Sequence, residues 1–400
     1  MMKFIVPLRR LCVCLLALIC ALGQILCLPA NADDSMPIQE EIAAEAQPVL
    51  DLSCKSAVLM EASTGTILYE QNPTEAMPPA SVTKIMTLLL VMEAIEAGTL
   101  KWDDKITASA HAASMGGSQI FLKEGEQMTA EDMIKSVVIA SANDAAVALA
   151  EHVAGSEAEF VKRMNERARE LGMKDTKFEN TNGLDDTAQN HVTSAKDIAI
   201  MSRALIAHPK ILEYSSIWMD TIRDGAFGLT NTNRLVRFYR GCNGLKTGST
   251  KKAGFCISVT AERDGMTLIC VIMGSESRDE RNATATQLLD WGFANYGLYT
   301  SGGGNPSPVR VTGGVKDRVA VRYPAFCCVL PKGEIAAVES RLDLPEELSA
   351  PVRMGESVGS IVYEVKGKQI GELPVTADED VPKISFGQLW IRMLARFLLV

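Results

Sequence analysis

The sequence predicts an α+β fold, in which an antiparallel sheet is flanked by helices and carries a helical subdomain, followed by a small all-β domain. Three observations predict it. Strand-like runs lie near both ends of residues 53–300, helix-period stretches lie between them, and short alternating runs fill residues 301–380. A sheet built from the two ends of a segment, with the helices inserted between, satisfies this order. A length of 400 residues also exceeds one ordinary domain.

The N-terminus has the pattern of a secretory signal peptide at residues 1–32. Three basic residues precede an apolar stretch, and Ala30-Asn31-Ala32 ends it as a small-residue cleavage site. The alternative is a transmembrane anchor that stays attached. Residues 33–52 form an acidic lead that contains alanine and proline. We therefore expect an exported protein.

The composition excludes some classes of protein. A formal charge of -9 argues against nucleic acid as the partner, and 47% apolar residues suffice for a sizeable core. The histidines are not at metal-ligand spacing, so we expect no metal, and no cofactor either: they are His111, His152, His191 and His208. Six cysteines follow the signal peptide, and free thiols are favoured over a disulfide framework: Cys54, Cys242, Cys256, Cys270, Cys327 and Cys328.

The first half of the catalytic segment begins with strands and continues with helices. Residues 56–70 form a predicted hairpin around Gly65, and Pro78-Pro79 then breaks the chain. Apolar residues recur at helical spacing from Ser81 to Ala97. Further helices are predicted at about 130–153, 157–171 and 194–207, the last with Thr193 or Ser194 as its cap.

The second half returns to strands. Two buried strands are predicted at 255–260 and 266–273, joined at Asp264-Gly265, and a helix follows at about 279–295. Gly302–Pro308 has the composition of a linker. Short alternating runs beyond it indicate the small all-β domain.

The last segment, residues 383–400, is predicted to be an amphipathic helix. Its polar residues fall on one narrow stripe, formed by Ser385, Gln388, Arg392 and Arg396. The segment is too short and too charged to span a bilayer comfortably. Tryptophan and arginine on such a helix suit a membrane surface. The alternative is a core helix that packs back on the protein.

Ser81 and Lys84 form the first pair with a chemical pattern. They stand three residues apart at the start of a predicted helix, so their side chains point the same way. A serine needs a base to become a nucleophile, and a lysine serves as that base only when burial or a second cation lowers its pKa. The pattern S-x-x-K alone is weak, because a serine that caps a helix start explains Ser81 equally well.

Two tripeptides supply what this pair lacks. Ser141-Ala142-Asn143 offers a hydroxyl that could relay a proton and an amide that could hold a substrate carbonyl. Lys246-Thr247-Gly248 offers the second cation, and its glycine permits a substrate backbone to approach a strand edge closely. The three motifs occur in this order, about 60 and then about 105 residues apart, and together they indicate a serine hydrolase.

On these motifs the sequence resembles the serine D-alanyl-D-alanine carboxypeptidases, or low-molecular-mass penicillin-binding proteins. The resemblance covers residues 55–297 and implies the fold of penicillin-binding proteins and serine β-lactamases. Its blocks are Ala57–Asn72, Pro79–Thr87, Met115–Ser118, Ser141–Ala145, Thr230–Asn233, Gly244–Gly248 and Leu288–Phe293. The all-β domain and the terminal helix match the family in layout more than in sequence.

The resemblance implies a reaction and a role for each site residue. Ser81 attacks the carbonyl between two D-alanines of a peptidoglycan stem peptide, Lys84 accepts its proton, and Ser141 passes a proton to the leaving amine. Asn143 binds the substrate peptide, Lys246 sustains the positive field, and the N–H groups of Ser81 and Ser249 form an oxyanion hole.

The remaining implied roles concern substrate binding and location. Arg281 aligns with the cation that holds the terminal carboxylate; the alternative is a surface arginine in a charged stretch. Thr247, Gly248 and Thr250 support the substrate. β-Lactam antibiotics would acylate Ser81, and the terminal helix would hold the exported enzyme at the outer face of the membrane.

Three alternatives remain at this point. A class A β-lactamase needs a glutamate in an E-x-x-L-N segment between Asn143 and Lys246, and the sequence has none there. A D,D-endopeptidase acting on cross-linked peptidoglycan would use the same residues. An inert wall-binding protein would keep the fold without the activity.

Overall fold

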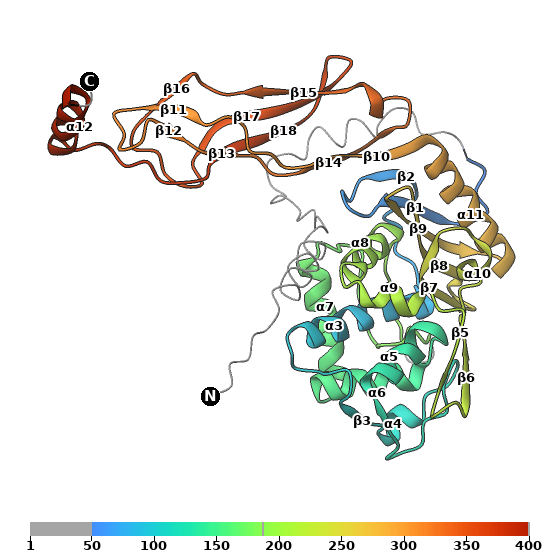
Figure 1. Cartoon of the computed structure of the whole chain (residues 1–400). Helices are drawn as coiled ribbons and strands as arrows, with labels where there is room; N and C mark the ends of the chain where they lie inside the picture. The colour runs from blue at the N-terminus through green and yellow to red at the C-terminus, as the bar shows by residue number, and fades with distance from the viewer. Residues whose placement is uncertain (1–49, 186–187, 399–400) are drawn as a thin grey trace, which may run out of the picture.

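The computed structural model describes residues 50–185 and 188–398. The predicted signal peptide and most of the acidic lead lie outside the described residues. A part that contains both helices and strands extends to residue 295, and an all-β part follows as an elongated arm that ends in a helix (Figure 1). This architecture confirms the predicted α+β fold.

A five-stranded antiparallel sheet in the order β2-β1-β9-β8-β7 organises the first part. Its strands come from both ends of the segment, because β1 pairs with β9. The bounds are β1 (Ser56–Glu61), β2 (Ile67–Gln71), β7 (Cys242–Thr250), β8 (Gly254–Arg263) and β9 (Met266–Ser275). The two hairpins expected around Gly65 and at Asp264-Gly265 are confirmed.

Both faces of the sheet are covered, which explains why its inner strands β1, β8 and β9 are buried over most of their length. Along β9, Leu268, Cys270 and Ile272 belong to the core shared with α11 (Arg278–Asn295). Ile269, Val271 and Met273, which alternate with these residues along the strand, belong to the larger core shared with the inserted helices. Successive side chains of a strand point to opposite faces, so one strand serves both cores.

The insert between β2 and β7 is mainly helical. Its helices are η1 (Ala80–Thr83), α3 (Lys84–Glu96), α4 (Ala110–Ala113), α5 (Ala130–Ile139), α6 (Asn143–Ala154), α7 (Glu157–Glu170), α8 (Ala195–Ile206), α9 (Lys210–Ser215) and α10 (Leu235–Phe238). Two short hairpins accompany them: β3 (Lys105–Thr107) with β4 (Gln127–Thr129), and β5 (Met219–Ile222) with β6 (Phe227–Thr230). Ser194 caps α8 by accepting the Asp197 N–H.

Three predicted elements differ in the structure. The stretch 130–153 is two helices, because Ser141 adopts a positive φ of 63° that no α-helix tolerates. The helix expected from Ser81 starts as the 3₁₀ turn η1 and becomes an α-helix at Lys84. Lys246-Thr247-Gly248 lies inside its own strand, β7, which sequence periodicity did not reveal.

The all-β part packs three small sheets around one apolar core. Its strands are β10 (Tyr296–Ser301), β11 (Val309–Thr312), β12 (Arg318–Val319), β13 (Val321–Arg322), β14 (Phe326–Pro331), β15 (Val338–Asp343), β16 (Glu347–Ser349), β17 (Ser357–Val365) and β18 (Lys368–Ala377), with a 3₁₀ turn, η2 (Ile335–Ala337). Phe326 and Tyr363 stack at its centre with ring centroids 4.2 Å apart. β10 follows α11 directly and pairs with β14.

The terminal helix α12 (Phe386–Leu398) lies at the far end of the arm (Figure 1). Its large apolar side chains are exposed: Phe386, Leu389, Trp390, Ile391, Met393, Leu394 and Phe397. On its polar side Arg392 forms an ion pair with Asp317 at 3.0 Å. The alternative of a core helix is therefore wrong. Among the described residues, no helix combines the length and the apolar character that crossing a membrane requires.

Candidate active site

The structure brings Ser81 and Lys84 into direct contact. Ser81 lies in the 3₁₀ turn η1, and Lys84 is the first residue of α3. The Lys84 Nζ donates to Ser81 Oγ at 2.9 Å and to the carbonyl oxygen of Asn182 at 2.8 Å. Lys84 is fully buried. Its amine is therefore fixed at the serine hydroxyl and shielded from water.

Burial and neighbouring charges prepare Lys84 to act as a base. Burial lowers its pKa well below the usual range, and the charge of Lys246 lowers it further. The negative charge of Asp144 acts in the opposite direction. Burial also lowers the pKa of Lys246 to about 7, with a contribution from the charge of Arg281. A depressed pKa favours the neutral form of a lysine, and the neutral amine can accept the serine proton.

The edge strand β7 runs directly beside Ser81. A Cβ atom on Gly248 would lie 2.8 Å from the Ser81 backbone nitrogen and 2.9 Å from the Pro79 carbonyl oxygen. Only glycine permits this approach. One residue back, the Thr247 hydroxyl donates to Thr232 Oγ1 at 2.9 Å. The serine thus faces an edge along which an extended peptide could lie.

Ser141 lies in the sharp turn between α5 and α6, and Asn143 is the first residue of α6. The Asn143 Nδ2 donates to the Gly116 carbonyl, and its backbone N–H donates to the Ser118 carbonyl, both at 2.7 Å. Its Oδ1 is buried and has no hydrogen-bond partner in the described part of the chain. The sequence suggested an amide that holds a carbonyl; the open group in the structure is an acceptor suited to a substrate N–H.

Arg281 is buried at 3% exposure, so the alternative of a surface arginine is wrong. It projects from the first turn of α11, and its guanidinium donates to Asn282 Oδ1 and to the Cys256 carbonyl. Cys256 pairs with Gly248 across β7 and β8. Arg281 therefore acts on the site through its charge on Lys246, with no hydrogen bond to Ser81 or Lys84 among those of the described residues.

The two remaining predicted positions, Ser249 and Thr250, lie at the end of β7. Ser249 is exposed, beside the glycine that approaches Ser81. The Thr250 Oγ1 accepts the Ala253 N–H at 3.0 Å and closes the turn into β8.

Strained backbone occurs immediately before Ser81 and at Ser141. Ala80 has a φ of 48°, and Ser141 has a φ of 63°, both in a region that such residues rarely adopt. The Thr83 hydroxyl donates to the Ala80 carbonyl at 2.8 Å and also contacts His191 Nε2 at 2.7 Å. Burial lowers the pKa of His191 to about 4, so this histidine is neutral at pH 7. Such strain persists where surrounding contacts hold it in place, often at functional sites.

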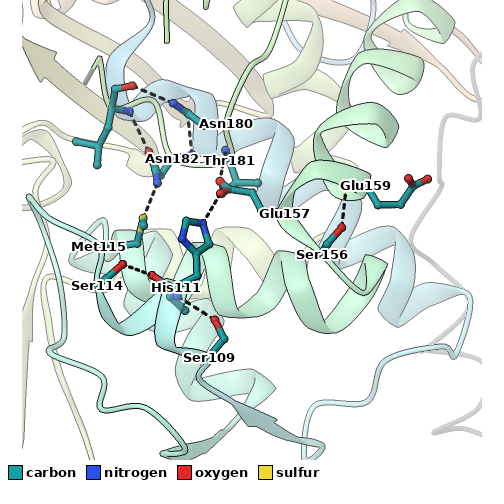
Figure 2. Close-up of polar contacts among 12 residues, drawn as sticks. Ser109, His111, Ser114, Met115, Ser156, Glu157, Glu159, Asn180, Thr181 and Asn182 are labelled. Atoms are coloured by element: carbon teal, nitrogen blue, oxygen red, sulfur yellow. Dashed lines mark hydrogen bonds and ion pairs between the residues drawn. The ribbon is translucent and has the colours of Figure 1, made fainter. Parts of the chain in front are cut away.

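Sequence reasoning missed the loop from Asn180 to Leu184. Asn182 supplies the carbonyl that holds Lys84, and its side chain reaches Met115 Sδ at 3.6 Å (Figure 2). Gly183 has a φ of 84°, and a Cβ there would lie 1.8 Å from the Ala80 carbonyl oxygen. The turn-forming residues Asn180-Thr181-Asn182-Gly183 were the available signal. Nothing in the local pattern linked that turn to Lys84.

Comparison with known families matches two models to this chain. Residues 41–277 match the family described as D-alanyl-D-alanine carboxypeptidase. Residues 300–383 match the C-terminal domain of penicillin-binding protein 5. The chain belongs to the D-alanyl-D-alanine carboxypeptidase family. The resemblance inferred from the three motifs is confirmed.

Curated relatives and solved structures agree with membership in this carboxypeptidase family. The chain is 43% identical over 339 residues to D-alanyl-D-alanine carboxypeptidase DacF of Bacillus subtilis, covering 83% of this chain and 87% of the relative. It is 33% identical to DacC of Escherichia coli, over 86% and 89% of the two chains. Penicillin-binding protein 5 of Haemophilus influenzae superposes with a TM-score of 0.75 at 32% identity, covering 84% of this chain and all of that one.

The cysteines and acidic residues form no second centre that the structure shows. No disulfide joins the six cysteines of the described residues. Within residues 50–185 and 188–398, no group of three or more histidine, cysteine or acidic side chains could hold a metal ion.

Proposed function

We propose that this carboxypeptidase-family enzyme cleaves the terminal D-alanyl-D-alanine bond of peptidoglycan stem peptides through an acyl-enzyme on Ser81. The observation that carries the proposal is the buried Lys84 amine, 2.9 Å from Ser81 Oγ, with its pKa lowered by burial and by Lys246. The B. subtilis and E. coli relatives, which carry the name of this activity, support it.

The proposed reaction has two stages, formation of the acyl-enzyme and its hydrolysis. Ser81 Oγ attacks the carbonyl carbon between the two D-alanines while Lys84 Nζ takes the hydroxyl proton. The tetrahedral intermediate collapses with cleavage of the C–N bond, and a proton delivered through Ser141 lets free D-alanine leave. Water then attacks the ester on Ser81, and the shortened peptide departs.

The substrate would lie along the β7 edge. The Asn143 Oδ1 would accept a peptide N–H, which satisfies an acceptor that is otherwise buried without a partner. Backbone N–H groups of Ser81 and Ser249 would stabilise the oxyanion, a contribution of about 3–4 kcal/mol per donor. Lys246, Thr247, Thr250 and Arg281 would supply positive charge and hydroxyl donors for the terminal carboxylate.

β-Lactam antibiotics would acylate the same serine. Penicillin-binding protein D2 of Listeria monocytogenes has been solved in ampicillin-bound and cefotaxime-bound forms. It is 35% identical to this chain, and the match covers 62% of this chain and all of the Listeria protein. That protein supports the use of a fluorescent penicillin as a probe of Ser81.

We propose further that the protein is exported and held at the outer face of the membrane. The signal-peptide pattern at residues 1–32 supports export. The exposed apolar side chains of α12, with Trp390 among them, support insertion into a membrane surface. Deletion of residues 383–400 should release the mature protein from anionic phospholipid vesicles in a flotation assay; continued binding would contradict the role of α12.

The test of the activity compares wild type with Ser81→Ala. Wild type should bind fluorescent penicillin covalently and release D-alanine from a stem pentapeptide, and Ser81→Ala should do neither while unfolding at the same temperature. Retention of either activity by the variant would remove Ser81 as the nucleophile. Release of cross-linked products without free D-alanine from the pentapeptide would assign a D,D-endopeptidase instead. A D-alanyl-D-alanine endopeptidase of Pseudomonas aeruginosa is 29% identical over 64% of this chain.

A further inference from the structure

The contact that orients Lys84 depends on a loop without regular secondary structure. The carbonyl oxygen of Asn182 accepts one hydrogen of the Lys84 amino group, and Ser81 Oγ accepts another. The neighbouring carbonyl of Thr181 accepts from the Thr87 hydroxyl at 2.6 Å, one turn further along α3. Whatever fixes the backbone at 181–182 therefore fixes the geometry of the base.

One carboxylate holds this backbone from outside the loop (Figure 2). Glu157 Oε1 accepts the Thr181 N–H at 3.1 Å and the Thr181 hydroxyl at 2.7 Å. Its other oxygen, Oε2, lies 2.8 Å from Nε2 of His111 on α4. Glu157 is the first residue of α7, where the helix dipole favours a negative charge. The Glu157 carboxylate thus belongs to α7, contacts His111 on α4 and is hydrogen-bonded to the loop that contains Asn182.

We propose that Glu157 is a positioning residue for the reaction, which acts through Thr181 and Asn182 to hold the Lys84 amine at Ser81. Glu157 has no contact with Ser81 or with Lys84 among those of the described residues. Its effect passes through one residue of backbone, from the Thr181 N–H that it binds to the Asn182 carbonyl that binds the lysine.

The energetic reason lies in the burial of Thr181. This residue is fully buried, so loss of the carboxylate leaves an N–H and a hydroxyl without partners. Unsatisfied buried donors are costly enough to move the backbone toward water. A displaced Asn182 carbonyl would release the amine and admit solvent beside it. The charges that face Lys84, those of Lys246 and Asp144, would remain.

The proposal rests on the proposed function, and its experiment uses acylation by fluorescent penicillin in the full-length enzyme. Glu157→Ala is the main variant, and Glu157→Gln is the conservative one, because a glutamine oxygen can still accept from both Thr181 donors. Glu159→Ala is the matched control, because Glu159 lies on the same turn of α7 as Glu157 (Figure 2). Its side chain forms an ion pair with the exposed Lys162.

The decisive readout is the pH profile of the acylation rate, measured apart from penicillin binding. Loss of the Asn182 acceptor by itself would lower the pKa of Lys84, but water admitted beside the amine relieves the burial that is the main cause of the lowered pKa. We expect the second effect to be larger, so that the pKa rises toward its usual range and a higher pH is needed to form the neutral base. Glu157→Ala should slow acylation tenfold or more and move the acidic limb upward by about one pH unit, while the dissociation constant for penicillin stays within about twofold. Each variant is also made with His111→Gln, so that the titration of the imidazole does not contribute to the limb.

Two comparisons decide the outcome. The proposal is supported if Glu157→Gln recovers the wild-type acylation rate and the wild-type position of the acidic limb, and if Glu159→Ala behaves like wild type in both measurements. If Glu157→Ala does not fold, Thr181→Val removes one of the two donors, and it should move the limb in the same direction by less. An unchanged limb in a folded Glu157→Ala or in Thr181→Val overturns the proposal. If wild type itself is not acylated, it is the proposed function that fails.

Discussion

The part of the molecule before residue 296 and the all-β part bury opposite kinds of side chain. Among the described residues, every buried polar or charged side chain lies between Ser56 and Thr284, and Lys84, Asp144 and Lys246 are among them. The all-β core consists of valines, isoleucines and aromatic rings around Tyr363. Burying an ionised group is expensive unless it is paired, so the first part carries a cost that the second part avoids.

The backbones differ in the same way. In the first part, Ala80, Phe121 and Ser141 hold positive φ angles outside any hairpin turn of the sheets. In the described all-β part, the one non-glycine residue with positive φ is Lys366, in the turn between β17 and β18. Strain and buried charge therefore occur together around Ser81. The comparison teaches that the catalytic part carries buried charge and backbone strain at its site, whereas the all-β part buries mainly apolar side chains and carries little strain.

The largest effect on acylation and stability is expected for a substitution of Gly183 in the first part of the molecule. Gly183→Ala should displace the Ala80 carbonyl, because the new Cβ would lie 1.8 Å from it at a φ of 84°. We expect at least a 100-fold loss of acylation and a destabilisation of about 4 kcal/mol or more. Penicillin labelling and urea unfolding measure the two effects. Gly333→Ala in the all-β part, where a Cβ meets nothing within 4 Å, is the control and should change neither.

A second prediction concerns the all-β core. Tyr363→Ala removes a fully buried ring stacked on Phe326 and should destabilise the protein by about 3–5 kcal/mol. Tyr363→Phe removes only the hydroxyl bonded to Ser301 at 3.3 Å and should cost about 1 kcal/mol. Denaturant titration measures both values. The acylation rate of the folded fraction should stay at the wild-type level, and a slower rate would show that the two parts are not separable in function.

A third prediction tests the cost of buried charge directly. The pKa of Lys246 is about 7 in the folded protein against a usual 10.5, so the unfolded chain binds a proton that the folded chain lacks between these values. Wild-type stability should therefore rise with pH from about 7 to 10.5 through this group. Lys246→Met should be more stable than wild type by about 2–4 kcal/mol below pH 7, with the advantage shrinking toward pH 10.

The same variant should lose activity. Without the charge of Lys246, the pKa of Lys84 rises, and acylation should need a higher pH. Unfolding free energies at pH 6 and pH 10, together with the pH profile of penicillin acylation, check both statements. A stability gain that does not depend on pH would show that packing, and not charge, limits this site.

Several features could be predicted because they depend on local patterns. Apolar strand-like runs and the turn residues at Asp264-Gly265 predicted the second hairpin, and the helix of residues 278–295 was expected almost to its ends. Ser81 and Lys84 stand three residues apart, so any helical turn brings them together. The 3₁₀ start of that helix changed its bounds but not the contact.

What the sequence alone determined, then, was the set of chemical groups and the order in which they occur: the serine, the two lysines and the amide of Asn143. The tertiary structure decided which of them meet and in what state. The break at Ser141, the edge position of β7 and the carbonyl of Asn182 arise from contacts across 60 to 100 residues or more. Only that packing buries Lys84 and Lys246, and burial is what lowers their pKa values and makes the roles proposed for Ser81 and Lys84 chemically possible.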